Sequence, residues 1–512
     1  MGSFKSKAKA FFGTEGFMGT SMTALVIGVV IAFNAVIYAL TSAFGLYLYV
    51  PDSFDMSISG NTDVLFESVK DKERIKVIFC REEAELESGE NDEVASFYYT
   101  AKQFRERYGD LVEIECVNLI TKRNQKGELV KNMSDYQLKT ADGEPYPMQE
   151  TTVVFVSEHS HKTIADISST TFTYDTNSSS EGYGTPTSYN GEEVFASMML
   201  WVMSKEHPKA YFTTFHGEVA DVTLANMLSC AGYEIDTIDL READMVPADA
   251  GMVIISNPVK DFERAVEGSG IYSEIEKLRE YLNSGGRLYA AIDPYVEGLT
   301  NLEGLLSEYG ITVSESEIEG KMIRDIVRDS ENAVTADSFT LIAGLPETET
   351  GELIRERLER YGSSGVLIRE CAALELSGGA EPLLVSSAAS ATYAGGVETD
   401  SRGGYALAAM SVKENDNGTE SRVFVVPSIY LAASDMLTMV GYGNRNFIYS
   451  VFEQAYEMED LPYGCKTTVF YTNGMLENFT MGNARFYTAL ILTVPVIIAI
   501  VGAVVVIKRK NR

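Results

Sequence analysis

Three strands predicted between residues 208 and 294 end in polar residues whose types could support chemistry. The first is followed by His216, Gly217 and Glu218, the second by Asn257 and the third by Asp293. Because ligands of open α/β sheets bind at the carboxyl ends of parallel strands, we expect these five residues to share one edge. A histidine beside two carboxylates can act as a general acid or base, hold a cation, or bind a ligand or partner.

The same five residues also have a purely structural interpretation. Asn, Asp and the prolines that follow them terminate strands and begin helices, and the dipeptide His216-Gly217 suits a tight turn. Both interpretations remain open at this stage. We treat the five residues as a tentative ligand- or partner-binding edge, and we assign none of them a catalytic role.

The chain lacks the motifs by which α/β enzymes usually bind nucleotides or activate a nucleophile. It contains no G-x-x-x-x-G-K-[S/T], no G-x-G-x-x-G after a strand, no G-x-S-x-G and no H-E-x-x-H. The five cysteines are widely spaced and form no C-x-x-C pair, so isolated buried thiols are favoured, and Cys80–Cys116 is the first pair to test for a bridge. Only His159 and His161 have a spacing that suits a metal, and exposed strand residues share it. We therefore expect no enzymatic activity, no cofactor and no metal.

The elements that must position the edge are predicted by an alternation of strands and helices over residues 208–460. Short Gly- and Pro-containing loops separate them, which is typical of a doubly wound parallel sheet with helices on both faces. The predicted strands are 210–215, 234–240, 251–256, 287–292, 383–386, 405–412 and 422–426, and the predicted helices are 219–231, 271–282, 299–309, 352–361 and 446–457.

A second α/β domain is predicted over residues 60–205. Its order is strand 75–79, helix 93–108, strand 111–119, strands 151–156 and 163–167, and helix 190–204, with polar loops at 121–147 and 168–189. This order is that of a thioredoxin-like domain. Cys80 stands where such a fold carries its redox pair but has no partner cysteine, so we expect no disulfide chemistry.

The two ends of the chain are apolar. Residues 22–50 and 486–507 carry no charged side chain and are long enough to cross a bilayer as helices. A cleaved signal peptide is the alternative for the first stretch, but the apolar region is longer than a signal sequence needs. We expect two transmembrane helices, with 461–485 as a membrane-proximal segment.

The charge distribution predicts the orientation of these helices. Three lysines precede the first and four basic residues follow the second, so residues 1–21 and the tail 508–512 should be cytoplasmic. The formal net charge of −32 makes the large region between them strongly acidic and argues against nucleic-acid binding. These features predict a two-pass membrane protein with a large extracytoplasmic part.

Several segments of the chain carry a resemblance to a known family: residues 211–218, 232–234, 247–250, Asn257-Pro258, Asp261 and 281–288. With these segments the chain resembles GldG-like proteins, the auxiliary proteins of ABC-type transport systems named from bacterial gliding motility. The resemblance covers nearly the whole chain and implies a place in a bacterial plasma membrane, although the family usually has Gly where this chain has Phe215. It implies a separate ATPase and permease as partners and implies no enzymatic activity.

The sequence thus predicts a non-catalytic extracytoplasmic accessory subunit of a bacterial ABC transporter. Two spans are too few for a transport path and no ATP site is present, so transport would need partner subunits. The alternative is a membrane-anchored cell-envelope hydrolase or sugar-binding protein that uses the edge formed by His216, Glu218 and Asp293. The transported substrate, its direction, the stoichiometry and any small-molecule or glycan ligand are not specified by the sequence.

Overall fold

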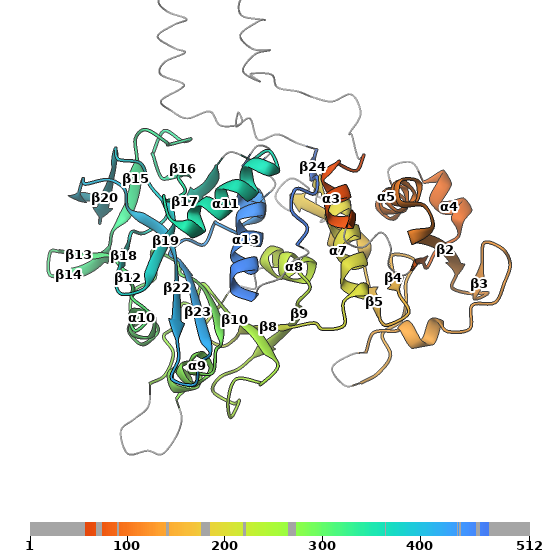
Figure 1. Ribbon diagram of the computed structural model, residues 1–512, viewed down its shortest axis with the longest axis horizontal. Helices are drawn as coiled ribbons and strands as arrows, with labels where there is room; N and C mark the ends of the chain where they lie inside the picture. The colour runs from red at the N-terminus through yellow and green to blue at the C-terminus, as the bar shows by residue number, and fades with distance from the viewer. Residues whose placement is uncertain are drawn as a thin grey trace, which may run out of the picture. The chain divides into compact units, whose positions relative to one another are not determined.

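The computed structural model describes residues 57–470 apart from 68–73, 90–91, 140–142, 176–184, 219–221, 265–272, 364, 438, 440–441 and 457–460. The predicted spans 22–50 and 486–507, the termini 1–21 and 508–512, and most of 461–485 lie outside these residues. Within them, no helix is long and apolar enough to cross a membrane. The described chain is of the mixed α/β class and contains a parallel sheet (Figure 1).

The first part of the chain forms a five-stranded sheet in the order β3-β2-β1-β4-β5. Strands β1 and β2 are parallel, and β4 and β5 run antiparallel to their neighbours. The elements are β1 (Ile75–Phe79), α5 (Glu93–Tyr108), β2 (Val112–Asn118), β3 (Arg123–Asn124), β4 (Val153–Val156), β5 (His161–Ile164) and α7 (Gly191–Met203). The predicted strands and helices of this region are therefore present.

Helix α5 has the predicted bounds, and a capping residue precedes it and a glycine follows it. The Asp92 side chain accepts a hydrogen bond from the Ala95 amide at 3.0 Å, which caps the first turn. Gly109 follows with φ +59°, a conformation that favours glycine and ends the helix. The buried face carries Phe104, whose ring centroid lies 4.3 Å from that of Phe195 on α7. The apolar stripe of α5 therefore packs against α7.

The loop predicted over 168–189 is more ordered than its composition suggests. It contains α6 (Ile167–Thr171) and an antiparallel pair, β6 (Phe172–Asp175) and β7 (Thr185–Tyr189), and β24 (Thr468–Val469) joins β7 from the far end of the chain. Thr is favoured in strands, β6 and β7 satisfy each other's backbone, and β24 adds a second partner to β7 from a distant part of the chain. The prediction of a loop is therefore wrong for residues 168–175 and 185–189, and residues 176–184 lie outside the described chain.

The second part of the chain is built on a nine-stranded sheet. Its order is β12-β18-β22-β23-β11-β10-β8-β9, with β19 also paired to β22. Strands β8 (Lys209–Thr213), β9 (Glu234–Ile238), β10 (Ala250–Ser256), β11 (Arg287–Ala291) and β23 (Glu420–Val426) are parallel, as predicted. Strands β12 (Ile311–Val313), β18 (Leu374–Leu376), β19 (Ala380–Val385) and β22 (Ala406–Glu414) are antiparallel to their neighbours.

The sheet is thus mixed, and the prediction of a wholly parallel sheet needs correction. Only residues 415–419 connect β22 to β23. A connection this short can join only antiparallel neighbours, because parallel strands need a crossover of a dozen or more residues.

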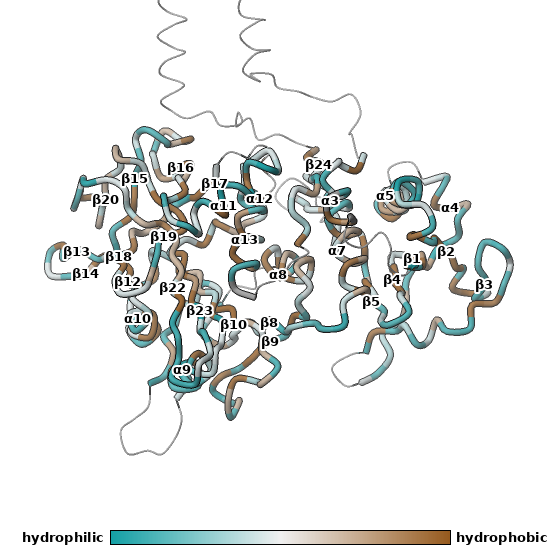
Figure 2. The backbone as a smooth tube through the Cα atoms, viewed as in Figure 1, coloured by the Kyte–Doolittle hydropathy of each residue, from teal (hydrophilic) through white to brown (hydrophobic). Residues whose placement is uncertain are grey.

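Helices cover both faces of the parallel strands. One face, which includes Tyr211, Val253 and Leu288, packs against α9 (Glu274–Asn283) and α10 (Thr300–Ser307). The other face, which includes Ala210 and Ile254, packs against α8 (Val222–Cys230) and α13 (Asn444–Tyr456). In Figure 2 much of α7 and of β22 is coloured as hydrophobic, in keeping with their many buried residues. Alternate residues of each strand thus enter two separate cores, which explains the near-continuous apolar runs.

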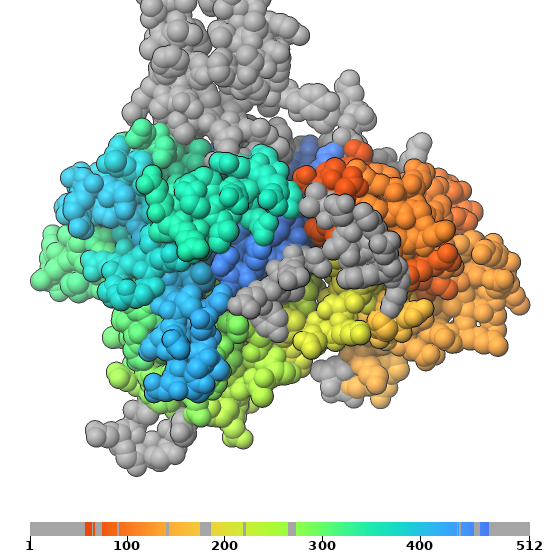
Figure 3. All heavy atoms as spheres, viewed as in Figure 1, coloured from red at the N-terminus to blue at the C-terminus, as the bar shows by residue number. Residues whose placement is uncertain are grey.

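Helix α9 begins at Glu274, after Ser273, rather than at residue 271 as predicted. The described fold also contains helices α3 (Asn61–Glu67), α4 (Glu83–Ser88), α11 (Glu349–Arg360) and α12 (Ser434–Leu437), and three small sheets. The small sheets comprise β13 (Glu315–Ile318) with β14 (Lys321–Arg324), β15 (Ile326–Asp329) with β20 (Ser390–Ala394) and β21 (Val397–Asp400), and β16 (Thr340–Ala343) with β17 (Val366–Arg369). In the space-filling view the green to cyan residues of this region form one continuous block (Figure 3).

Candidate functional site

The loop after β8 contains two residues in the left-handed backbone conformation. Phe215 has φ +78° and Gly217 has φ +79°, with His216 between them. A Cβ atom added to Gly217 would lie 2.2 Å from Cγ2 of Val259, so this position admits only glycine. Phe215, at the position where the resembling family usually has Gly, adopts the glycine-like conformation with its side chain 61% exposed. The guanidinium of Arg241 lies 4.1 Å from the centroid of this ring and helps to hold it.

This backbone turns the His216 ring inward, between two carboxylates. Its Nδ1 lies 3.0 Å from Oε1 of Glu218, and its Nε2 lies 3.0 and 3.2 Å from the two carboxylate oxygens of Glu274. The side chains of His216, Glu218 and Glu274 are 4%, 7% and 3% exposed. The ring also stacks on Phe262 with a centroid separation of 3.8 Å. Both ring nitrogens of His216 therefore have a partner, and solvent does not reach them.

The electrostatics of this cluster favour a protonated imidazole. Burial alone would lower the pKa of His216, but its hydrogen bonds to Glu218 and Glu274 outweigh burial and raise the pKa to about 9. Burial alone would raise the pKa of Glu218. The hydrogen bonds that its carboxylate accepts from His216 and from backbone amides have the larger effect, so the pKa of Glu218 is lowered. At neutral pH the cluster is an imidazolium held between two carboxylates.

Glu274 is the member of the cluster that sequence reasoning missed. It is the first residue of α9, and its Oε2 also accepts a hydrogen bond from the Glu263 amide at 2.7 Å. The Ser273 hydroxyl caps the helix: it accepts from the Glu276 amide and donates to the Glu276 carboxylate, in the sequence pattern S-x-x-E that is typical of a helix start. That pattern could have located the helix start and placed Glu274 in its first turn. Nothing in the sequence indicates that Glu274 would meet a histidine 58 residues earlier.

Asn257 lies beside this cluster but does not bond the His216 ring. Its backbone has φ +53°, and its amide donates to the Ala291 carbonyl at 2.9 Å. The next residues of its loop, Val259 and Lys260, both donate their amides to the His216 carbonyl at 2.9 Å. The loops after β8 and β10 are therefore tied together through the backbone. The Asn257 side-chain oxygen is buried and has no hydrogen-bond partner among the described residues.

Asp293 is engaged in a turn of its own. Its Oδ1 accepts a hydrogen bond from the Tyr295 amide at 2.9 Å, and its carbonyl accepts from Nη1 of Arg324 at 2.6 Å. The strand ends are adjacent, because β10 lies between β8 and β11. The predicted edge therefore exists, but Glu274 rather than Asp293 supplies the second carboxylate to His216.

This arrangement is suited to fastening loops rather than to transferring protons. A general base must reach the proton it removes, and the His216 ring can do so only if Glu218 or Glu274 moves away. Within the described residues, no group of three or more His, Cys, Asp or Glu side chains could hold a metal ion. The chemistry that the cluster can perform in this geometry is charge pairing between the loop after β8 and the start of α9.

The five cysteines are all buried and unpaired. Burial raises the pKa of Cys80 to about 12, so its thiolate, the reactive form, is scarce at neutral pH. Desolvation likewise raises the pKa of Cys116 to about 12. Cys80 and Cys116 thus have the character of isolated core thiols.

Comparisons with known proteins give no family. No family model matches the chain, and no curated protein matches it. Among solved structures, the chain is similar to the mmIFT52 N-terminal domain, with 16% identity over 48% of this chain and 96% of that chain and a TM-score of 0.35.

Two further structural similarities are equally distant. A putative ThuA-like protein from Bacteroides uniformis is 10% identical over 49% of this chain and 93% of that chain, with a TM-score of 0.27. The exo-β-1,4-mannosidase Op5Man5 from Opitutaceae bacterium strain TAV5 is 12% identical over 54% of this chain and 40% of that chain, with a TM-score of 0.28. At these TM-scores the similarities assign neither a fold nor a function to the chain.

Proposed function

We propose that the protein is a non-catalytic, extracytoplasmic accessory subunit of a bacterial ABC transporter that works with a separate ATPase and permease. In this proposal, a thioredoxin-like domain (60–205) and a doubly wound α/β domain (208–460) lie outside the plasma membrane. Transmembrane helices at 22–50 and 486–507 anchor them, and both termini are cytoplasmic. The polar, acidic composition between two apolar, basic-flanked ends motivates the topology.

The observation that best supports this topology is the meeting of the two ends of the described chain. Ser59 donates both its amide, at 2.9 Å, and its hydroxyl, at 2.6 Å, to the Glu192 carboxylate. The Lys466 amide donates to the same carboxylate at 3.2 Å, and the Asn61 side chain donates to the Gly464 carbonyl at 2.9 Å. The segments that lead to both proposed spans therefore meet on α7, as an external body held by two helices in one membrane requires.

The α7 helix that receives these segments also links the two parts of the fold. Phe195 packs on Phe104 of α5, while Glu193 pairs with Arg445 and accepts a hydrogen bond from the Tyr449 hydroxyl, both on α13. Glu193 is 1% exposed, so removing either partner would leave a buried charge uncompensated. A displacement of the membrane-proximal segments would thus be felt by both domains, which suits a subunit that relays a conformational change.

The enclosed His216 ring favours this proposal over the alternative. A hydrolase or sugar-binding protein that uses the edge of His216, Glu218 and Asp293 would need an accessible imidazole or a free carboxylate there. In the described structure each of these groups already has an internal partner.

Co-purification from the native membrane tests the proposal most directly. The full-length tagged chain, extracted in mild detergent, should retain an ATPase and a multi-span permease. A double variant, His216→Gln with Glu218→Gln, separates the two candidates. The alternative predicts that the complex assembles but loses function through the edge alone, whereas our proposal predicts that any loss follows the loss of folding. Recovery of the chain without an ATPase or permease would contradict the proposal.

The orientation is tested separately by cysteine labelling of intact cells. A membrane-impermeant reagent should label a cysteine placed at Ser178 but not one placed at Ser3 or Asn511. Labelling at either terminus would contradict the predicted topology.

A further inference from the structure

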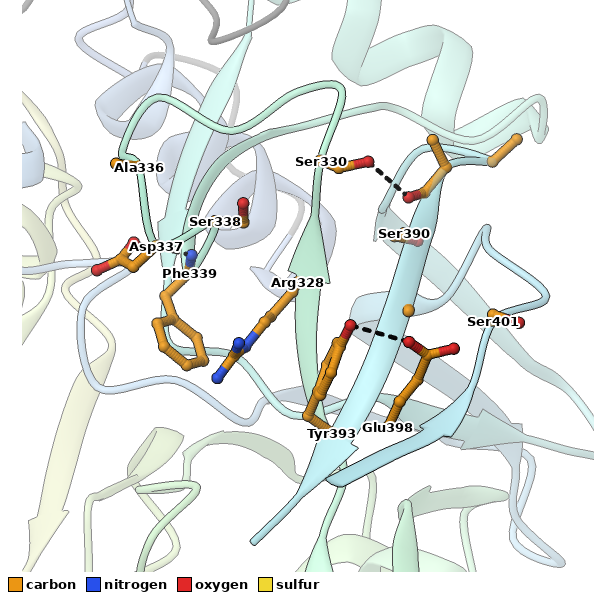
Figure 4. A pocket seen from close by; sticks show the side chains of 13 residues that line it. Arg328, Ser330, Ala336, Asp337, Ser338, Phe339, Ser390, Tyr393, Glu398 and Ser401 are labelled. Atoms are coloured by element: carbon orange, nitrogen blue, oxygen red, sulfur yellow. Dashed lines mark hydrogen bonds between the residues drawn. The ribbon is translucent and has the colours of Figure 1, made fainter. Parts of the chain in front are cut away.

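A caged arginine lies at the junction of two cavities on the small sheet formed by β15, β20 and β21. The guanidinium carbon of Arg328 lies 4.2 Å from the ring centroid of Phe339 and 4.5 Å from that of Tyr393. Arg328 is opposite Ala391 in the β15–β20 register, so Tyr393 is its diagonal neighbour on the same face. Figure 4 shows the guanidinium between the two rings.

The hydrogen-bond donors of this arginine are not used within the described chain. Its Nε is buried without a hydrogen-bond partner, and no described residue accepts a hydrogen bond from the guanidinium. Each ring presents a face to the guanidinium carbon, which holds the guanidinium in place. The two rings thus position a planar, permanently charged group of donors from which no described residue accepts a hydrogen bond.

Both cavities share Arg328, Phe339 and Tyr393 as walls. The larger has a volume of 610 Å³ and the smaller 200 Å³. The larger volume is within the range of about 300–1,000 Å³ that small-molecule sites occupy. The smaller cavity is also lined by Pro294 and Tyr295, which follow β11. The site is therefore at the carboxyl edge of the parallel sheet, where ligands of α/β proteins bind.

The larger cavity is also lined by two carboxylates, Asp337 and Glu398, and by hydroxyls such as those of Ser330 and Ser401. Glu398 accepts from the Tyr393 hydroxyl through Oε2 at 3.0 Å, and Asp337 accepts from the Thr335 hydroxyl and the Phe339 amide through Oδ1. The second oxygen of each carboxylate accepts no hydrogen bond from a described residue. One fixed cation and two carboxylates disfavour a multiply charged anion, whereas they match a single carboxylate that is accompanied by hydroxyl donors.

We infer that this pocket binds a small polyhydroxylated carboxylate, a sugar acid, whose carboxylate is held by the Arg328 fork. The ligand hydroxyls donate to Asp337 and Glu398. Strain in the walls is consistent with a formed site, because Ser338 has φ +64° although it is not glycine. The site is separate from the His216 cluster and does not depend on the proposed membrane role, since binding is a property of the chain alone.

Equilibrium dialysis of the purified full-length chain in mild detergent against labelled D-glucuronate tests the inference. We expect saturable binding that unlabelled D-glucuronate displaces and that D-glucose, which has the hydroxyls but no carboxylate, displaces at least about tenfold less well. Arg328→Gln should weaken binding at least about tenfold. Arg328→Lys should do the same, because lysine keeps the charge but not the planar fork.

Two further variants separate loss of the site from loss of folding. Arg369→Gln is the matched control: Arg369 also lies over a tyrosine, with 4.8 Å to the Tyr430 centroid, but is paired with Asp435, so binding should be unchanged. Ala389→Phe, at an exposed position in the larger cavity, should abolish binding with the thermal midpoint of unfolding retained.

Three results would overturn the inference. They are the absence of saturable D-glucuronate binding, equal displacement by D-glucose, and wild-type binding by both Arg328→Gln and Ala389→Phe. Saturable binding of labelled L-serine in the same dialysis, without binding of D-glucuronate, would show an amino-acid site instead and would likewise refute the sugar-acid assignment.

Discussion

The His216 cluster makes the stability of the protein depend on pH in a direction that can be measured. The pKa of the imidazole is raised from 6.5 to about 9 by its bonds to Glu218 and Glu274, against the opposing effect of burial. The folded state therefore binds a proton that the unfolded state releases between these two values. By linkage, the cluster contributes its full stabilisation below pH 6.5 and loses it as the pH rises through 9.

The size of this contribution follows from the same two values. Each tenfold difference in proton affinity corresponds to about 1.4 kcal/mol, so the raised pKa stabilises the folded chain by about 3 kcal/mol at pH 6. His216→Gln removes this contribution and leaves two buried carboxylates without a cation, which should cost about 3–5 kcal/mol at neutral pH. The free energy of unfolding of the wild type should then exceed that of His216→Gln most at pH 6. The difference should shrink by about 3 kcal/mol by pH 9.5.

Urea unfolding of the full-length chain in detergent, followed by circular dichroism between pH 6 and pH 9.5, gives this difference. His207→Gln is the matched control. Burial lowers the pKa of His207, which stacks on Trp201, so His207 is neutral in both states above pH 7. Its difference from the wild type should therefore stay constant from pH 7 to pH 9.5.

A wild-type advantage over His216→Gln that changes by less than about 1 kcal/mol across this range would refute the reasoning. It would mean that the imidazole is neutral in the folded chain and acts only as a hydrogen-bonding spacer. The same result would reopen the interpretation of His216 as a base.

Four other expectations can be checked with simpler measurements. In a urea titration, Gly217→Ala should lower the free energy of unfolding by about 2–4 kcal/mol, because the new Cβ would contact Val259 and the backbone φ is positive. The control Gly298→Ala, at φ +85° with nothing within 4 Å of the new Cβ, should lower it by about 1 kcal/mol. Glu192→Gln should speed limited proteolysis next to Ser59 and Lys466 several-fold, with the exposed Glu206→Gln as control, since an amide offers one acceptor oxygen instead of two. Cys80 in the native chain should react with iodoacetamide at pH 8 at least about 100-fold more slowly than in the denatured chain, and insulin-reduction turnover by the native chain that Cys80→Ser abolishes would contradict this. Replacing both predicted spans with leucine-rich helices of equal length should reduce co-purification with the permease, because the apolar stretch 22–50 carries Asn34, whose amide would seek a hydrogen bond to another helix in lipid. Full recovery of the permease would show that the spans are only tethers.

Periodicity predicted most of the elements because their signals are local. The strand at Ile75–Phe79 and the helix at Glu93–Tyr108 were placed by their apolar patterns alone. The same holds for the strands that carry the edge: β10 ends at the predicted residue, and β8 and β11 end two residues and one residue before it. Such signals need no knowledge of what the element packs against.

The small sheets were not predictable in the same way. Strand β13, Glu315–Ile318, is largely exposed and has no clear alternation of apolar residues, so only its pairing with β14 makes it a strand. The pairing of β24 with β7 joins residues that are far apart along the chain. Where strand formation depends on a distant partner, composition alone predicts a loop.

In the candidate site too, the local contact was predictable and the contact between distant residues was not. His216 and Glu218 are two residues apart, and their contact follows from a local turn, whereas Glu274 reaches the ring from the start of a helix that was predicted to begin three residues earlier. Arg328 gave no sequence signal, because its cage comes from Phe339 in one loop and Tyr393 on another strand.

The two ends of the same sheet edge thus differ in what they leave available. At β8 and β10 the loops are closed: His216 is charge-paired on both sides, and its carbonyl accepts two amides of the neighbouring loop. At β11 the chain continues into Pro294 and Tyr295, which line a cavity with an unsatisfied guanidinium at its wall. A buried polar donor is costly unless something satisfies it, and the rule that ligands bind at the carboxyl edge points to this place rather than to the histidine. His216, which looked most reactive in the sequence, therefore has both ring nitrogens engaged by carboxylates. The first site to assay for a ligand is the pocket around Arg328.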